Sequence, residues 1–552
     1  MRRDGLEETN GFRSLKCRVA HQPFLQSCHG VFTVIFGGIT TSSHHRAGNG
    51  VSLLDDSVRA PSTGKSSFVG NVLALGGGTV LAQTIAVLVA PVTSRLFDPE
   101  AFGLAAVFGS IVGFFAIVSC LRYELAIMLP EDDVDAAALL GLCFILPAAI
   151  SLLSLAAIAC CGQLVLETLQ ASELVPYAWL IPLALFLQGI LLPLRYWNSR
   201  HRRFHRLASV SVACGASGVA ATIGAGCAGY TSGGSLVMAK LVTPICEVGA
   251  LLWYLPRDVS YISRHCKARS MWRMARRYVK FPAFSALSGL VNTGSHQVPP
   301  ILLAAFFGTA VVGLYSRALA LVALPVMLVA QAVSQVFFQR AAEKKAAGED
   351  LGQLVEQVCV RLTGLMTLPL LMVAIIGPDI FSVLFGIKWT EAGLYAAILV
   401  PYMFFVLITA TLTSLFDVLE CQGTEFLFNV LLLTSRVASL VLGAVLLRDV
   451  KAAVLLFSVV SALGYAWRAH YILSTVGVPL VRIVVSLRPY LVNAALPIAM
   501  TAAARWWVNL SSVYILAVAL AVSAPCYIYL LRQDTHVRQA FWRFMRRIGV
   551  SR

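Results

Sequence analysis

Four cationic side chains lie inside segments of the chain that are otherwise apolar: Arg122, Lys240, Arg317 and Arg436. An ionised group is costly in hydrocarbon, so a charge retained in such a segment is a functional candidate. The guanidinium group donates two parallel hydrogen bonds, which suits a phosphate or another oxyanion. Arg317 and Arg436 are the strongest candidates for binding an anion, because neither can easily reach the end of its segment.

Two carboxylates accompany these cations. Glu124 follows Arg122 by two positions, and Glu247 lies two helical turns beyond Lys240 on the same helical face. Each is a candidate charge partner, and Glu247 is also a candidate for taking up a coupling proton. Structural interpretations stand beside these: Arg122 and Glu124 form an ion pair at a helix end, Glu247 only neutralises Lys240, or Lys240 extends toward a membrane surface.

A second set of candidates is polar and able to hydrogen-bond ligand hydroxyl groups: Asn292, His296, Gln297, Gln331 and Gln335. Polar contacts between helices explain such residues at least as often. His296 precedes a pair of prolines and is in addition a candidate for pH sensitivity.

Metal, redox and nucleotide chemistry find no support in the sequence. The 13 cysteines include no C-x-x-C pair and no cluster with histidine, so we expect no metal site and no cofactor. A Walker loop is also missing, so we do not expect ATP hydrolysis.

The segments that hold these residues are membrane-spanning helices. Of 552 residues, 58% are hydrophobic and only 13% are charged, whereas soluble proteins have about 25% charged residues. The apolar segments are about 20 residues long, enough to cross a bilayer, and are apolar on all faces, which excludes the alternation of a membrane barrel. We predict an all-α polytopic membrane protein with ~14 transmembrane helices, at 69–94, 103–128, 137–160, 174–194, 207–228, 235–255, 281–304, 310–337, 361–385, 392–416, 425–447, 452–473, 490–507 and 511–531.

The loops alternate in charge, which orients these spans. The loops after spans 4, 6, 8 and 12 are rich in Lys and Arg, whereas loops after odd-numbered spans contain almost none: 161–173, 229–234 and 305–309 have none, and 386–391 has only Lys388. By the positive-inside rule the basic loops and both termini are cytoplasmic. The net charge of +16 then predicts contact with anionic lipid of the inner leaflet, and nucleic acid is not an expected partner.

An internal repeat organises the spans. The segment 90–104 is similar to 299–314, with proline near the middle of one helix, a tight turn, and Gly-Leu opening the next helix. Six spans separate the copies, so both have the same orientation, as in carriers built from parallel repeats. We predict two six-helix lobes and two appended helices: a disordered or non-native leader at 1–64, an N-lobe at 65–256, a basic cytoplasmic linker at 257–280, a C-lobe at 281–473, spans 13 and 14 at 474–531, and a basic cytoplasmic tail at 532–552.

Three blocks together resemble a known family. They are Thr93 to Gly103 with Arg122 to Pro130, Leu194 to Asn198 with the basic run to Arg206, and Gly313 to Leu319 with Gln331 to Phe337. In this order they resemble the Wzx-like oligosaccharide flippases, the polysaccharide biosynthesis proteins of the multidrug/oligosaccharidyl-lipid/polysaccharide exporter superfamily. The similarity covers about residues 66–470.

This resemblance implies a carrier of undecaprenyl-pyrophosphate-linked oligosaccharide, moved from the cytoplasmic to the outer leaflet of the bacterial inner membrane for O-antigen, capsule or exopolysaccharide synthesis. It also implies two lobes in a V around a cationic cavity. The four cations would then bind the pyrophosphate, and the polar candidates would contact sugars. Other implied partners are the polymerase and export machinery of the same pathway.

Two alternatives remain. A sibling transporter, either a cation-coupled drug exporter or an exporter of the peptidoglycan precursor, would have the same architecture, although few buried acids accompany the arginines. A membrane polymerase, a ligase or a lipid-dependent glycosyltransferase would be an enzyme, but the predicted external loops are too short to form a large external site.

Overall fold

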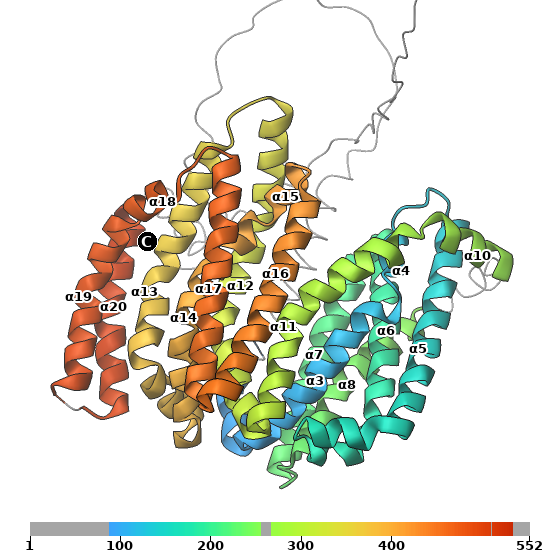
Figure 1. Cartoon of the computed structure of the whole chain (residues 1–552), viewed down its shortest axis with the longest axis horizontal. Helices are drawn as coiled ribbons and strands as arrows, with labels where there is room; N and C mark the ends of the chain where they lie inside the picture. The colour runs from blue at the N-terminus through green and yellow to red at the C-terminus, as the bar shows by residue number, and fades with distance from the viewer. Residues whose placement is uncertain (1–84, 86–87, 256–266, 509, 534–552) are drawn as a thin grey trace, which may run out of the picture.

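The structure is a computed structural model that describes residues 85, 88–255, 267–508 and 510–533. The regular elements in these ranges are all helices, and they form two groups that converge at one end and diverge at the other (Figure 1). Within these ranges, 11 helices are long and apolar enough to cross a membrane, or 12 if one bent pair is a single span. The predicted all-α polytopic membrane fold is confirmed, and the number of spans agrees roughly with the prediction.

The first group surrounds α3 (Pro99–Ser119). Helices α6 and α8 pack on α3, α5 packs on α6, and α7 packs on α8. The other members are α4 (Tyr123–Ala126), α5 (Asp133–Thr168), the 3₁₀ helix η1 (Ser172–Tyr177), α6 (Leu180–Arg200), α7 (Phe204–Cys227), α8 (Gly233–Trp253) and the short α10 (Ala268–Arg277).

The second group is centred on α14 (Thr390–Leu412), which contacts α12, α13 and α17. A π-helix, η2, leads into α11, which packs on both α3 and α16 and so belongs to both groups. The elements are η2 (Phe281–Ser285), α11 (Ala286–Phe307), α12 (Thr309–Ala346), α13 (Gly352–Phe385), η3 (Ile387–Trp389), α15 (Ser414–Val418), α16 (Gln422–Leu442), the π-helix η4 (Gly443–Leu447) and α17 (Val450–Thr475).

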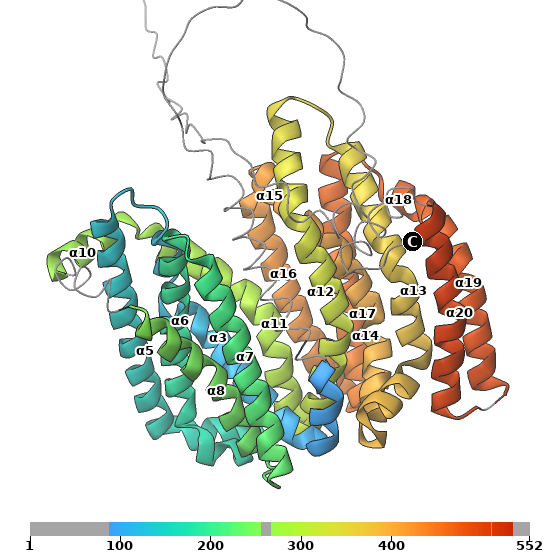
Figure 2. The same ribbon diagram turned by 180° about the vertical axis from the view of Figure 1, so that it is seen from behind.

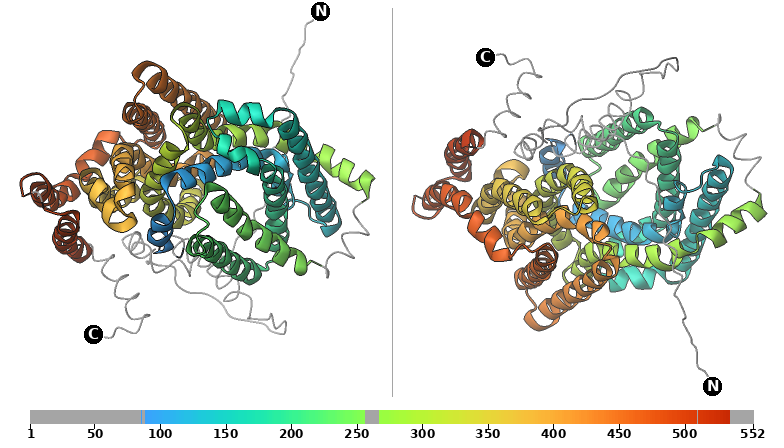
Figure 3. Two further views of the ribbon diagram at one scale, coloured as in Figure 1. Left: turned by 90° about the horizontal axis from the view of Figure 1, so that it is seen from below. Right: turned by 90° about the horizontal axis from the view of Figure 1, so that it is seen from above.

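The last helices form an appendage on α13. Helices α18 (Leu480–Ser486) and α19 (Arg488–Trp506) are bent by 49° and make one candidate span, and α20 (Ser512–Gln533) follows. Helices α19 and α20 both contact α13, and they lie at the outer edge of the second group (Figures 2 and 3). This agrees with the two appended helices of the predicted fold, and the division of the other helices into two lobes of six stays a prediction.

The two groups meet most closely where α3 crosses α12. A Cβ atom on Gly103 would lie 1.7 Å from the carbonyl oxygen of Thr309, and one on Gly313 would lie 1.8 Å from that of Pro99. Both glycines are therefore required for the crossing. Because the repeat aligns Gly103 with Gly313 and Pro99 with Thr309, each copy presents the same contact to the other, as expected for two halves related by a pseudo-two-fold axis.

Several predicted boundaries need correction. The span at 103–128 is too long: α3 ends at Ser119, because Leu121 and Arg122 have positive φ angles of 49° and 64° that no α-helix contains. The span at 174–194 is displaced, since η1 covers its start and α6 continues to Arg200. Of the span at 69–94, the structure describes only residue 85 and the helical part at 88–94. The whole leader at 1–64 and most of the tail at 532–552 lie outside the described residues.

Candidate functional site

Arg317 lies on α12 at the convergent end of the molecule. Its guanidinium carbon lies 4.0 Å from the ring centre of Phe102 and 5.8 Å from that of Trp389, and its Nη2 donates to Thr93 Oγ1 at 3.2 Å. Its Nε has no hydrogen-bond partner in the part of the chain that the structure describes. The guanidinium group is therefore held by ring faces and one hydroxyl, and its Nε is a buried donor without a partner among the described residues.

Contacts between residues 94–98 and 383–389 surround Arg317 and join the two groups. Lys388 Nζ lies 2.5 Å from Asp98 Oδ1, and Trp389 Nε1 donates to the Ser94 carbonyl at 2.7 Å. Arg95 Nη2 donates to the Val383 carbonyl at 3.1 Å. We call this set the end clamp. It accounts for Lys388, the one basic residue of the predicted outer loop 386–391.

Lys240 lies on α8 and reaches α3. Its Nζ donates to the Ala105 carbonyl at 2.7 Å, and its side chain is exposed. A Cβ atom on Gly109, one turn farther along α3, would lie 3.8 Å from the same Nζ. The ammonium group therefore lies against the small residues of this α3 face and has a backbone carbonyl as its partner.

Glu247 does not neutralise Lys240, contrary to one interpretation of the sequence. Its Oε1 accepts from Arg195 Nε at 2.8 Å and from Nη2 at 2.5 Å, and Glu247 is 4% exposed. Two helical turns separate Lys240 and Glu247 by about 10 Å along the axis, too far for a direct pair. Glu247 is thus the charge partner of Arg195 on α6. Lys240 has no carboxylate partner among the described residues.

Arg436 on α16 is only 1% exposed. Its Nη1 donates to the Ser295 carbonyl and Oγ atoms at 2.9 and 2.6 Å, and its Nε donates to Ser461 Oγ at 3.0 Å. Its guanidinium carbon also lies 4.9 to 5.5 Å from the ring centres of Tyr402, Tyr465 and Phe457. In this conformation Arg436 joins α11, α16 and α17, and a ligand cannot reach it. Its binding of pyrophosphate stays a prediction.

Arg122 and Glu124 lie at the divergent end, with 3.7 Å between Nη1 and Oε1. Glu124 is 2% exposed. Burial raises the pKa of this carboxyl group above its ordinary value, an effect that a hydrogen bond from the backbone and the charge of Arg122 oppose. Arg122 is partly exposed and approaches α11, since a Cβ atom on Gly289 would lie 3.7 Å from its Nε. The predicted pair exists, on a turn rather than within a span.

The uncharged candidates divide between exposure and packing. Asn292 and His296 lie one turn apart on α11 and are exposed, whereas Gln297 packs against Gly113 of α3. The side chains of Gln331 and Gln335 on α12 lie outside what the structure describes. No group of three or more metal-ligating side chains occurs among the described residues.

Sequence reasoning missed Arg468 on α17, which is 5% exposed. Its Nη2 donates to Glu425 Oε1 at 3.1 Å and to Thr413 Oγ1 at 3.2 Å, and its Nη1 donates to Asn429 at 3.2 Å. The signal was present, because Arg468 is a charge inside the predicted span 452–473. These three hydrogen bonds and the ion pair with Glu425 mark it as a structural cation, although its buried Nε has no partner among the described residues.

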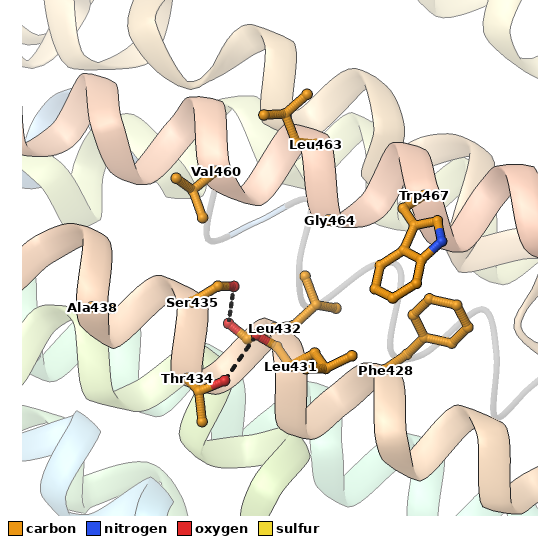
Figure 4. A pocket seen from close by; sticks show the side chains of 10 residues that line it. All are labelled: Phe428, Leu431, Leu432, Thr434, Ser435, Ala438, Val460, Leu463, Gly464 and Trp467. Carbon is orange, nitrogen blue, oxygen red and sulfur yellow. Dashed lines mark hydrogen bonds between the residues drawn. The ribbon is translucent and has the colours of Figure 1, made fainter.

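A groove of about 530 Å³ separates α16 from α17 (Figure 4). Its lining is mostly apolar. Its two hydroxyl groups are both used: Thr434 donates to the Val430 carbonyl at 3.0 Å and Ser435 to that of Leu432 at 3.2 Å. The groove therefore offers mainly hydrocarbon contact, and the indole N–H of Trp467 is its other polar group.

Membrane-spanning helices in two groups, joined where α3 of the first group crosses α12 of the second, define a transporter fold. Three solved structures are similar. The lipid II flippase MurJ in an inward closed conformation has a TM-score of 0.62 and 10% identity, over 84% of this chain and 99% of that one. An inward-facing multidrug resistance MATE transporter of the MOP superfamily has a TM-score of 0.56, and a MOP superfamily transporter from Pyrococcus furiosus has a TM-score of 0.50; each is 14% identical, over 75% of this chain and 96% of the other.

The family follows from the sequence match. The family model described as polysaccharide biosynthesis protein matches residues 92–394, more than half of the chain, and the chain belongs to this family. No curated protein matches it. The chain is thus a membrane protein of the polysaccharide biosynthesis family that the sequence blocks indicated, and its fold is similar to that of the solved MurJ and MATE transporters.

Proposed function

We propose that this protein is a flippase that carries undecaprenyl-pyrophosphate-linked oligosaccharide from the cytoplasmic to the outer leaflet. The observation that carries the proposal is a row of three cations along α3. Arg317 lies over Phe102 in its first turn, Lys240 contacts Ala105, and Arg122 lies just beyond its end. The 21 residues of α3 extend for about 30 Å, the thickness of the hydrocarbon core.

Such a row suits a polar anion that must cross lipid. A pyrophosphate group without counter-charges would be very costly in hydrocarbon, and cations spaced along one helix offer it successive partners. Arg122 lies at the divergent end, Arg317 lies at the end clamp, and Lys240 contacts α3 at Ala105, about one turn from Phe102. Asn292 and His296 on the adjacent α11 supply hydrogen bonds for sugar hydroxyls.

The direction of transport rests on the charge of the loops. The end clamp includes residues of the loop 386–391, which has one basic residue and is expected outside. The divergent end then faces the cytoplasm and receives substrate there. The inside-negative potential favours expulsion of an anion by about 2.3 kcal/mol per charge for each 100 mV.

The proposal is tested by reconstitution in liposomes with a fluorescent short-chain prenyl-pyrophosphate oligosaccharide. We expect translocation by the wild type and a loss of tenfold or more in Lys240→Gln and Arg317→Gln. The control is Lys451→Gln, which removes an exposed cation that pairs with Glu391 away from α3. Equal rates in all four proteins would contradict the cation row.

The same liposomes separate the alternatives. Lipid II and a cationic drug, added in place of the oligosaccharide lipid, test the sibling exporters. Transport of either one without the oligosaccharide lipid would replace our proposal. Mass analysis of the glycan tests the enzyme alternative, since a polymerase or ligase changes the chain length or attachment and a flippase does neither.

A further inference from the structure

Helix α10 presents an outer face rich in cations at one end of the bundle. Lys267, Arg269, Trp272 and Arg276 are all exposed, and Trp272 is 62% exposed. The Arg276 guanidinium carbon lies 5.0 Å from the ring centre of Trp272. The outward face therefore combines a large amphipathic ring with several positive charges, and its opposite face packs on the protein.

The inner face of α10 is fixed to the first group of helices. Met274 is 2% exposed, and Tyr123 Oη donates to the Ala275 carbonyl at 3.0 Å. Arg273 Nη2 lies 2.8 Å from Asp135 Oδ1, in the first turn of α5. These contacts determine which face points away, so the exposure of the basic face follows from packing.

The neighbouring spans place this face at a membrane surface. Asp135 opens the membrane-spanning α5, and α10 is separated from η2 and α11 by only three residues. Figure 1 shows α10 across the end of the first group, beside α4. A helix between the ends of two membrane helices lies at the depth of lipid headgroups, where tryptophan rings and long cationic side chains are typical.

We propose that the outer face of α10, formed by Arg269, Trp272 and Arg276, binds the anionic phospholipid headgroups of the surrounding bilayer. The arginines donate to lipid phosphates, and Trp272 inserts at the boundary between headgroups and chains. This surface is separate from the row of cations along α3. The inference does not depend on the transported substrate.

The test is native mass spectrometry of the detergent-purified full chain with phosphatidylglycerol or phosphatidylcholine. We expect the wild type to prefer phosphatidylglycerol, and Arg269→Gln/Arg276→Gln to bind it about 20-fold more weakly. Arg448→Gln/Lys451→Gln removes the same charge from exposed positions between η4 and α17, in a loop predicted on the opposite side of the membrane, and should retain the wild-type affinity. No preference in the wild type, or equal binding by the α10 variant, would overturn the inference.

A second readout locates the lipid at α10. In nanodiscs, brominated phosphatidylglycerol should quench tryptophan fluorescence more strongly in the wild type than in Trp272→Phe, and brominated phosphatidylcholine should show a smaller difference. Identical quenching in both proteins would place the bound lipid elsewhere and contradict the proposal. Neither experiment measures translocation, so its result is independent of the flippase assay.

Discussion

Arg436 shows how a membrane cation can be stabilised without a carboxylate. Its described partners are two serines, one backbone carbonyl and three aromatic rings. Hydrogen bonds to charged groups are worth about 1.5–3 kcal/mol each. We therefore expect Ser461→Ala to destabilise the protein by about 2 kcal/mol and Arg436→Gln by more, measured as thermal unfolding in detergent. An unchanged melting temperature of Arg436→Gln would show that the contacts of Arg436 with these serines and rings do not stabilise the fold.

Glu124 gives a prediction for pH. Burial raises the pKa of the Glu124 carboxyl group in the folded protein. The folded protein therefore still holds this proton at pH values above 4.5, the ordinary pKa at which the unfolded chain releases it. Stability must then fall as the pH rises above about 4.5 toward the folded-state pKa. Glu124→Gln should remove this component, so that its melting temperature depends less on pH between 4.5 and 8. If the melting temperatures of the wild type and the variant changed with pH in parallel, Glu124 would not be the source of this pH dependence.

At the scale of helices, the crossing of α3 and α12 depends on two glycines. Gly103→Ala places a methyl group 1.7 Å from a backbone oxygen, so the helices must separate. We expect a strong loss of thermal stability and of yield. Gly224→Ala is the matched control, since a Cβ atom there meets nothing within 4 Å, and it should melt at the same temperature as the wild type or higher.

The ion pair of the end clamp, Asp98 with Lys388, should favour the state in which the convergent end is closed. Asp98 and Lys388 are both 62% exposed, and such pairs contribute about 0.2–1 kcal/mol. Asp98→Lys or Lys388→Asp alone should therefore change the initial rate of translocation by up to about fivefold, and the double exchange should restore it. A double variant as altered as the single ones would show that the pair does not couple.

Helix boundaries show what the sequence could predict. Spans such as 207–228 and 452–473 agree with α7 and α17 to within a few residues, because their length and uniform hydrophobicity determine them. The turn at Leu121 and Arg122 contains neither glycine nor proline, so nothing in the local sequence marks it. Contacts between distant helices, such as Arg195 with Glu247 or Arg436 with Ser295, depend on packing that no spacing reveals.

At the scale of the whole molecule, the reciprocal glycine contact implies that the two halves associate through their own surfaces. We expect the chains 1–260 and 261–552, co-expressed with an affinity tag on one of them, to purify together and to translocate substrate. Gly313→Val in the second chain should abolish co-purification, because its side chain would collide with the Pro99 carbonyl. Separate recovery of the unsubstituted halves would contradict this prediction.

The position of the crossing also determines how motion is amplified. Gly313 lies four residues after the start of α12, which has 38 residues, so nearly 50 Å of helix extends beyond it. The crossing can therefore act as the fulcrum of a long lever. A rotation of about 10° there would displace the far end of α12 by roughly 9 Å while the helices at the fulcrum remain in contact.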